Sequence, residues 1–114
     1  MSKVSHIEPK DLAAALKEGR CVLIDVREPS EHRSARIPGA MLHPLSSFDP
    51  GKLPCEPGKT LVIACAAGGR SLRAATACAA AGMPATNLTG GLAAWHKAGL
   101  PVDRLDRGRA EAGR

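Results

Sequence analysis

The sequence predicts an α/β domain built on a parallel β-sheet. The sequence has two short apolar runs, residues 21–26, which charged residues flank, and residues 60–64. Continuous apolar runs of this length are typical of strands covered on both faces. Segments with helical start and stop signals alternate with them. In such sheets ligands bind at the carboxyl ends of the strands, so the residues that follow each run are the first candidates for function.

Local signals justify each further element. Pro9 suits a first helical turn and Gly19 a helix end, which predicts a helix over residues 9–18. Trp95 is expected to anchor the core and Cys78 to fill a small core position. Residues 43–59 contain four prolines and are expected to be irregular. The remaining predictions are helices over residues 29–34, 71–81 and 92–98 and short strands near Met41 and Leu42 and over residues 86–88.

The strongest functional signal follows the second apolar run. A cysteine is placed between a strand end and a helix start, where successive backbone N–H groups of a short glycine-containing loop form an anion-binding concavity. We therefore expect this cysteine to act as a thiolate, with Ser71 capping the helix. The candidate residues are the cysteine, Cys65, and the loop that follows it, namely Ala66, Ala67, Gly68, Gly69, Arg70 and Ser71.

The free energies involved favour the loop amides over the helix dipole as the source of thiolate stability. Lowering a cysteine pKa from about 8.5 to about 6.5 needs roughly 2.7 kcal/mol. A helix terminus supplies about 0.3 to 1 kcal/mol, whereas each hydrogen bond to a charged group contributes about 1.5 to 3 kcal/mol. The alternative is a plain buried core cysteine, but packing gives no reason for Gly-Gly-Arg-Ser to follow Cys65.

A second polar group follows the first apolar run. Asp25, Arg27 and Glu28 are expected at the carboxyl end of that strand, as supports of the site. Arg70 could attract an anionic substrate or pair with a carboxylate such as Glu28, and we favour the pairing. The four cysteines and four histidines show no zinc-ligand spacing, so neither a metal site nor a disulfide framework is expected. Cys55, between two prolines, is the secondary thiol expected to be exposed.

Charge and composition argue against nucleic acid as a partner. The formal net charge is +5, but no long basic run occurs, and one Phe, one Trp and no Tyr leave no stacking platform. A mild positive field suits small anions.

We predict one domain over residues 1–102 and a polar, flexible tail over 103–114. No signal peptide or membrane span is recognised, which predicts a cytoplasmic protein without a membrane role.

Four motifs in this order resemble those of single-domain rhodaneses. They are Leu-Ile-Asp-Val-Arg-Glu-Pro-Ser-Glu from residue 23, Ile-Pro-Gly-Ala from residue 37, Cys-Ala-Ala-Gly-Gly-Arg-Ser from residue 65, and Leu-Thr-Gly-Gly-Leu-Ala-Ala-Trp from residue 88. The resemblance extends from about His6 to Val102. It implies a three-layer α/β sandwich with a five-stranded, mostly parallel sheet and helices on both faces.

The resemblance also implies a sulfurtransferase that needs no cofactor. Its catalytic residue would be Cys65, which would take a sulfane sulfur from a small anionic donor such as thiosulfate, hold it as a persulfide, and pass it to a small thiol, cyanide or a protein acceptor. The loop amides would stabilise the charge on sulfur in the manner of an oxyanion hole. The uncharged Ala66 and Ala67 leave preference for thiosulfate open, because some thiosulfate-specialised relatives carry basic side chains there.

Two departures and two alternatives remain. Ala35-Arg36 stands where the family usually has Gly-His, and His32 replaces a usual aromatic residue. A phosphatase or arsenate reductase of related fold is one alternative. The signature of those enzymes has five residues between the cysteine and the arginine, whereas this chain has four residues between Cys65 and Arg70. A non-catalytic binding or regulatory module is the other, because a fold does not fix a function.

Overall fold

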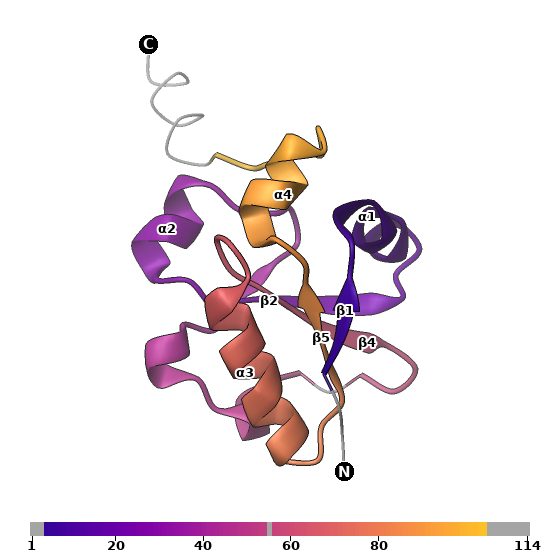
Figure 1. Cartoon of the computed structure of the whole chain (residues 1–114), viewed down its shortest axis with the longest axis vertical. Coiled ribbons are helices and arrows are strands. Elements are labelled where there is room, and N and C mark those ends of the chain that lie inside the picture. Colours follow the sequence, from indigo (N-terminus) through magenta and orange to yellow (C-terminus); the bar gives the residue numbers. More distant parts are fainter. Residues whose placement is uncertain (1–3, 55, 105–114) are drawn as a thin grey trace.

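The computed structural model describes residues 4–54 and 56–104. All strand pairs in its five-stranded sheet are parallel, and the strand order is β1-β5-β4-β2-β3. The strands are β1 (Val4–Ile7), β2 (Cys21–Asp25), β3 (Met41–Leu42), β4 (Thr60–Ala64) and β5 (Ala85–Leu88). The helices are α1 (Pro9–Lys17), α2 (Pro29–Ser34), α3 (Gly69–Ala80) and α4 (Gly91–Lys97) (Figure 1). The predicted α/β class and five-stranded parallel sheet are confirmed.

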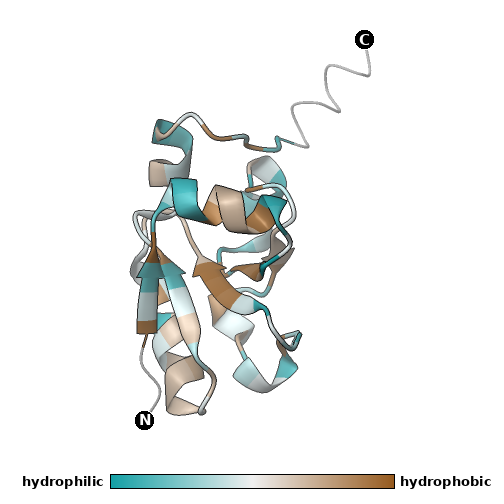
Figure 2. Cartoon of the chain, turned by 90° about the vertical axis from the view of Figure 1, so that its right-hand side faces the viewer, coloured by the Kyte–Doolittle hydropathy of each residue, from teal (hydrophilic) through white to brown (hydrophobic). Residues whose placement is uncertain are grey.

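The central strands are covered on both faces, as their composition predicts. All five residues of β2 are buried, and they alternate between two core clusters. Val22 and Ile24 face the side of α3, whereas Cys21 and Leu23 face the side of α1 and α4. Figure 2 shows a largely apolar strand in the middle of the molecule, next to strands with hydrophilic segments, and helices that carry both hydrophilic and apolar turns. Two helical layers therefore enclose the sheet.

Strand β1 is missing from the local predictions. Only four strands have a clear signal in the sequence, but residues 4–7 pair in register with β5 along its whole length. The segment Val-Ser-His-Ile has two exposed polar residues at its centre. Edge strands are held by main-chain pairing to a neighbour rather than by apolar runs, so composition alone does not reveal this one.

Helix α3 starts two residues earlier than predicted. Gly68 precedes it with φ 109°, a left-handed conformation that favours glycine. The helix therefore begins at Gly69, and Ser71 lies inside the first turn instead of capping it. The prediction that Ser71 caps the helix is wrong. Its hydroxyl is free to turn toward the end of β4.

The other element bounds differ from the predictions by one residue or less, apart from two 3₁₀ turns in the proline-rich segment. These turns cover Leu45–Ser47 and Pro50–Lys52. Trp95 is 2% exposed and donates its indole N–H to the Pro101 carbonyl at 2.6 Å, which confirms it as a core anchor. Cys78 is fully buried, as expected for a core filler. Within the described ranges, no helix combines the length and apolar character that crossing a bilayer requires.

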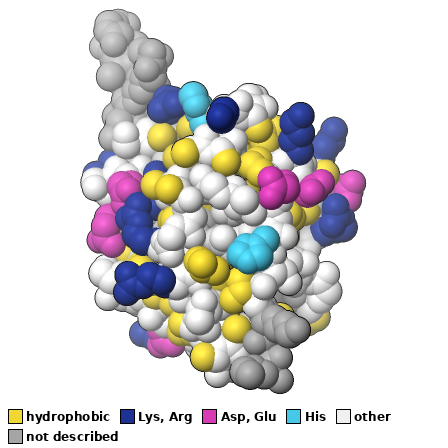
Figure 3. Space-filling model, in the orientation of Figure 1, with side chains coloured by type: hydrophobic (Ala, Val, Ile, Leu, Met, Phe, Trp, Pro, Cys, Tyr) yellow, Lys and Arg dark blue, Asp and Glu magenta, His cyan; other side chains and the backbone are white. Residues whose placement is uncertain are grey.

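The expected boundary at Val102 stays a prediction. Asp103 exchanges two backbone hydrogen bonds with Arg36, at 2.8 and 2.9 Å, so main-chain contacts continue one residue beyond it. Residues 105–114 of the expected tail lie outside the described residues, as does Cys55. On the face drawn in Figure 3, Lys and Arg side chains are interspersed with Asp and Glu instead of gathering into one basic patch.

Candidate functional site

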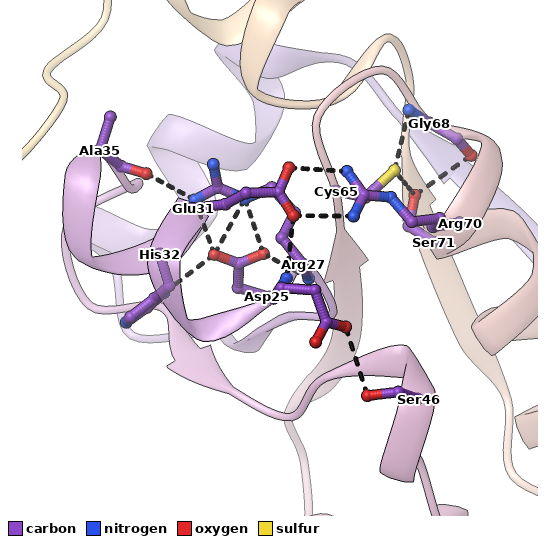
Figure 4. A network of polar contacts seen from close by, with 11 residues as sticks. Asp25, Arg27, Glu31, His32, Ala35, Ser46, Cys65, Gly68, Arg70 and Ser71 are labelled. Atoms are coloured by element: carbon purple, nitrogen blue, oxygen red, sulfur yellow. Dashed lines mark hydrogen bonds and ion pairs between the residues drawn. The ribbon is translucent and has the colours of Figure 1, made fainter.

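Cys65 lies at the carboxyl end of β4, directly before the loop that leads into α3. The residue is 2% exposed. Its Sγ accepts a hydrogen bond from the backbone N–H of Gly68 at 3.0 Å and one from the Ser71 hydroxyl at 3.3 Å (Figure 4). The loop donors therefore point inward at the sulfur, as the sequence predicts.

The electrostatic consequence is a thiol that ionises more readily than an ordinary one. Burial by itself raises the pKa of Cys65. Hydrogen bonds from the Ser71 hydroxyl and from the backbone amides of Ser71, Gly68 and Ala67 outweigh burial, and the net pKa is lowered. Several donors act together, in agreement with the estimate that a helix dipole alone falls short.

The first turn of α4 fixes the direction of the loop amides. The N–H groups of Leu92 and Ala93 donate to the carbonyls of Cys65 and Ala66, at 2.8 and 3.0 Å. In a planar trans peptide the carbonyl and the following N–H point in opposite directions. Holding the Ala66 carbonyl against α4 therefore turns the N–H of Ala67 toward the sulfur.

Gly91 permits this close approach. A Cβ atom at position 91 would lie 2.4 Å from the Cys65 carbonyl oxygen and 2.7 Å from that of Ala66, and the residue has φ +60°. Only glycine fits both the conformation and the space. The pair Gly90-Gly91 thus belongs to the site, although it follows Cys65 by more than twenty residues.

Arg70 braces the loop, but its partner differs from the predicted one. The guanidinium makes a two-pronged contact with Glu31 on α2, Nη1 to Oε1 at 2.8 Å and Nη2 to Oε2 at 2.9 Å. This pairing lowers the pKa of Glu31 to about 2. The suggested pairing with Glu28 is wrong, because Glu28 precedes α2 and accepts from Ser46 at 3.3 Å. Glu31 is one helical turn further on and faces the loop.

Asp25 and Arg27 form a buried pair behind the loop. Arg27 Nη2 lies 2.8 Å from Asp25 Oδ2, and the two residues are 5% and 3% exposed. His32 Nδ1 lies 2.8 Å from the same oxygen. Burial raises the pKa of Asp25, but hydrogen bonds from Arg27 and His32 outweigh it and lower the net value. Figure 4 shows this cluster beside the Glu31–Arg70 contact, which joins α2 to the Cys65 loop.

One further polar residue near the sulfur, Asn87, is absent from the sequence-based prediction. Asn87 on β5 is 6% exposed and lies 2.6 Å from the Ser71 hydroxyl, and its other side faces His6 on β1 at 3.5 Å. The available signal is an asparagine inside a buried strand, where apolar residues are expected. In the part of the chain that the structure describes, no group of His, Cys, Asp and Glu side chains is arranged to hold a metal ion.

Surface hollows differ in their relation to Cys65. One, about 430 Å³, lies at the amino ends of the strands, away from Cys65, and is lined by residues such as Lys59, Leu61 and Met83. A second, about 310 Å³, adjoins the loop at Ala66 and includes His96 and Arg104. A third, about 10 Å³, lies directly against Cys65 and is lined also by Asp25, Arg27 and Leu92. The second and the third hollow therefore border the thiol loop.

Comparison with known proteins shows the family to which the chain belongs. The family model described as "Rhodanese-like domain" matches residues 8–98. A protein named sulfurtransferase from Allochromatium vinosum is 31% identical over 101 residues, which cover 87% of this chain and 94% of that protein. An uncharacterised protein of Synechocystis and the probable adenylyltransferase/sulfurtransferase MoeZ of Mycobacterium tuberculosis are each 41% identical over 84% of this chain. The chain spans 54% and 26% of their lengths.

Solved structures agree on the fold. A rhodanese-related protein of Thermoplasma volcanium superposes with a TM-score of 0.77 at 29% identity, over 87% of this chain and 97% of the other. A protein of unknown function from Rhodopseudomonas palustris, described as a possible tyrosine phosphatase, superposes with a TM-score of 0.74 at 30% identity, over 88% of this chain and 85% of the other.

Proposed function

Since the chain belongs to the rhodanese-like domain family, whose members include proteins named sulfurtransferases, we propose that it transfers sulfane sulfur through a persulfide on Cys65. The observation that carries the proposal is the convergence of donors on one buried sulfur. Gly68 N–H and the Ser71 hydroxyl both lie within hydrogen-bonding distance of Cys65 Sγ. These donors favour the thiolate, which is the nucleophilic form of cysteine.

In the proposed first step the Cys65 thiolate attacks the outer sulfur of thiosulfate. A new S–S bond forms, the S–S bond of thiosulfate breaks, and sulfite leaves with that electron pair. The terminal sulfur of the persulfide then carries the negative charge. The N–H groups of the loop, held by α4, stabilise this charge without having to reorganise.

In the second step an acceptor nucleophile attacks the terminal sulfur. With cyanide, thiocyanate forms and the electron pair of the breaking S–S bond returns to Cys65 as a thiolate. A small thiol or a protein thiol would react in the same way. The hollow beside Ala66, with His96 and Arg104 on its lining, supports approach of an anionic reactant from that side.

The main alternative is phosphoryl chemistry, for which the name given to the R. palustris protein is the reason. Two observations favour sulfur instead. Cys65 is 2% exposed, so a single terminal sulfur atom reaches it more easily than a tetrahedral phosphoryl group. Arg70 is also engaged by Glu31, whereas a phosphatase arginine has to face the bound oxygens.

Intact-mass measurement after treatment with thiosulfate tests the proposal. We expect one added sulfur atom on the wild type and on Cys21→Ser, Cys55→Ser and Cys78→Ser, and none on Cys65→Ser. A panel of persulfides and thiosulfonates in parallel identifies the preferred donor. Failure of every donor to load Cys65 would favour a binding module, and faster release of phosphate from an aryl phosphate would favour the phosphatase alternative.

A further inference from the structure

The Ser71 hydroxyl lies among more acceptors than it has protons. Its oxygen is 3.3 Å from Cys65 Sγ, 3.2 Å from the Gly68 carbonyl and 2.6 Å from Oδ1 of Asn87. A serine hydroxyl donates one hydrogen bond. Ser71 is fully buried, so water does not supply a second donor. The shortest of the three contacts is the one to Asn87, which therefore competes with the sulfur for the single proton.

Asn87 can act either as acceptor or as donor in its contact with Ser71. Its amide has an acceptor oxygen and a donor nitrogen of nearly the same shape, and half a turn of the amide exchanges them. With the oxygen toward Ser71, the amide accepts the hydroxyl proton. With the nitrogen toward Ser71, it donates to the hydroxyl oxygen and leaves the proton for Cys65 or the Gly68 carbonyl. Of these two acceptors the thiolate is the charged one and therefore binds the proton more strongly.

The far side of the amide can accommodate both orientations. His6 Nδ1, 3.5 Å from the Asn87 amide, accepts from the nitrogen when it is unprotonated and donates to the oxygen when it is protonated. The register His6↔Asn87 between β1 and β5 places the two residues side by side on adjacent strands. Asn87 thus has a partner on each side in either orientation.

We propose that Asn87 is a positioning residue for Cys65. It accepts the Ser71 proton while the sulfur is a neutral thiol, and it turns to donate to Ser71 once the sulfur is a thiolate, so that the hydroxyl points at the negative charge. A charged acceptor binds a donor more strongly than a neutral one, which favours the second arrangement after ionisation. An amide has both a donor and an acceptor and can therefore satisfy Ser71 in both states.

Isosteric and apolar replacements of Asn87 separate this role from packing. Asn87→Asp keeps the shape but supplies only acceptors when ionised, so it holds the Ser71 proton away from the sulfur. Asn87→Leu removes both functions and leaves the proton free for Cys65. We expect the pKa of Cys65, read from the pH profile of its alkylation by iodoacetamide, to rise by about one unit or more in Asn87→Asp, which slows alkylation about tenfold at pH values well below that pKa. In Asn87→Leu the rate should fall by less than about threefold.

The measurement is the pH profile of alkylation, followed at the peptide that contains Cys65, with circular dichroism to verify folding. Repeating the measurement in the Ser71→Ala background tests whether Asn87 acts on Cys65 through the Ser71 hydroxyl. There, adding Asn87→Asp should slow alkylation by less than about threefold, because no hydroxyl remains to be turned. An equal loss in both backgrounds would show that charge alone acts, and a loss in Asn87→Leu as large as in Asn87→Asp would show that packing alone acts. Either result, or an unchanged rate in Asn87→Asp, overturns the proposal.

The inference shares with the proposed function only the assumption that Cys65 ionises. Alkylation reports the thiol pKa whether or not sulfur is transferred. Failure of persulfide formation with a normal Asn87→Asp effect would overturn the proposed function alone. Persulfide formation without an Asn87→Asp effect would overturn the role of Asn87 alone.

Discussion

Two buried cysteines on the same side of the sheet differ in acidity. Cys65 and Cys78 belong to one core cluster, at 2% and 0% exposure, and burial raises the pKa of both thiols. At Cys78 nothing offsets burial, and the net pKa is raised. At Cys65 hydrogen-bond donors outweigh burial, and the net pKa is lowered. Burial by itself therefore produces an inert thiol, and the arrangement of donors makes one reactive.

Position within the fold explains the difference. Cys78 lies in the interior of α3, where backbone N–H groups are used by the helix itself. Cys65 precedes the helix, where the first N–H groups have no intrahelical partner and remain available to a ligand or a side chain. The same helix thus encloses one cysteine and stabilises the anion of the other.

The largest effect is expected when the loop is displaced, because Cys65 then loses its hydrogen-bond donors and becomes a buried, inert thiol like Cys78. In Gly91→Ala the new Cβ would lie 2.4 Å from the Cys65 carbonyl oxygen, so the loop and α4 have to separate. We expect persulfide formation to fall at least about a hundredfold, the equivalent of two or more lost hydrogen bonds to the thiolate. The measurement is the rate of sulfur loading by intact mass.

The matched control for that prediction is Gly99→Ala. Gly99 also has a positive φ, +79°, but its Cβ would meet open space. Both variants should lose about 1 to 2 kcal/mol of stability from backbone strain. Gly91→Ala should lose more, because its Cβ also meets the carbonyls of Cys65 and Ala66. Only Gly91→Ala should lose sulfur loading, and equal losses in the two variants would indicate that general destabilisation is responsible.

A smaller effect is expected when one donor is removed and the loop stays in place. Ser71→Ala deletes the hydroxyl 3.3 Å from Cys65 Sγ. Because a hydrogen bond to a charged group contributes about 1.5 to 3 kcal/mol, the pKa of Cys65 should rise by about one to two units. The pH profile of Cys65 alkylation gives this value directly. Thr76→Ala, which removes an exposed hydroxyl bonded to the Leu72 carbonyl on the same helix, should leave the profile unchanged.

A modest effect is expected at the contact between the loop and α2. Glu31→Gln removes the charge that faces Arg70 but keeps an oxygen able to accept from the Glu28 N–H. Since both side chains are about one third exposed, we expect a loss of about 1 kcal/mol or less in the free energy of unfolding. Sulfur loading should slow by a few fold. Glu18→Gln, which breaks the exposed pair with Arg20, should not slow it.

The smallest effect concerns the acid stability of the same contact. The pKa of Glu31 is about 2 in the folded protein, below its ordinary value of 4.5. A lowered pKa means that the stabilisation is complete above pH 4.5 and declines as the pH falls toward 2. The difference in unfolding free energy between wild type and Glu31→Gln should therefore shrink over that interval. A difference that stays constant between pH 6 and pH 2 would contradict the ion pair.

Prediction from the sequence succeeds where the relevant residues are neighbours in the chain. The apolar run before Cys65 and the glycines after it predict strand, loop and helix by local conformational preference, and the inward amides follow from that geometry. Prediction is less successful for partners contributed by other elements. Glu28 and Glu31 lie on the same short segment, and only the turn of α2 decides which of them reaches Arg70.

The sequence by itself determined the α/β class, the position of a candidate nucleophile at a strand end and a loop able to bind an anion, because each depends on residues a few positions apart. Tertiary structure alone decided the pairing of β1, the partner of Arg70, the contact of α4 with the loop carbonyls and the place of Asn87 beside Ser71. These contacts join residues that are far apart in the chain. Their geometry depends on strand register and helix packing, which the conformational preferences of neighbouring residues do not determine.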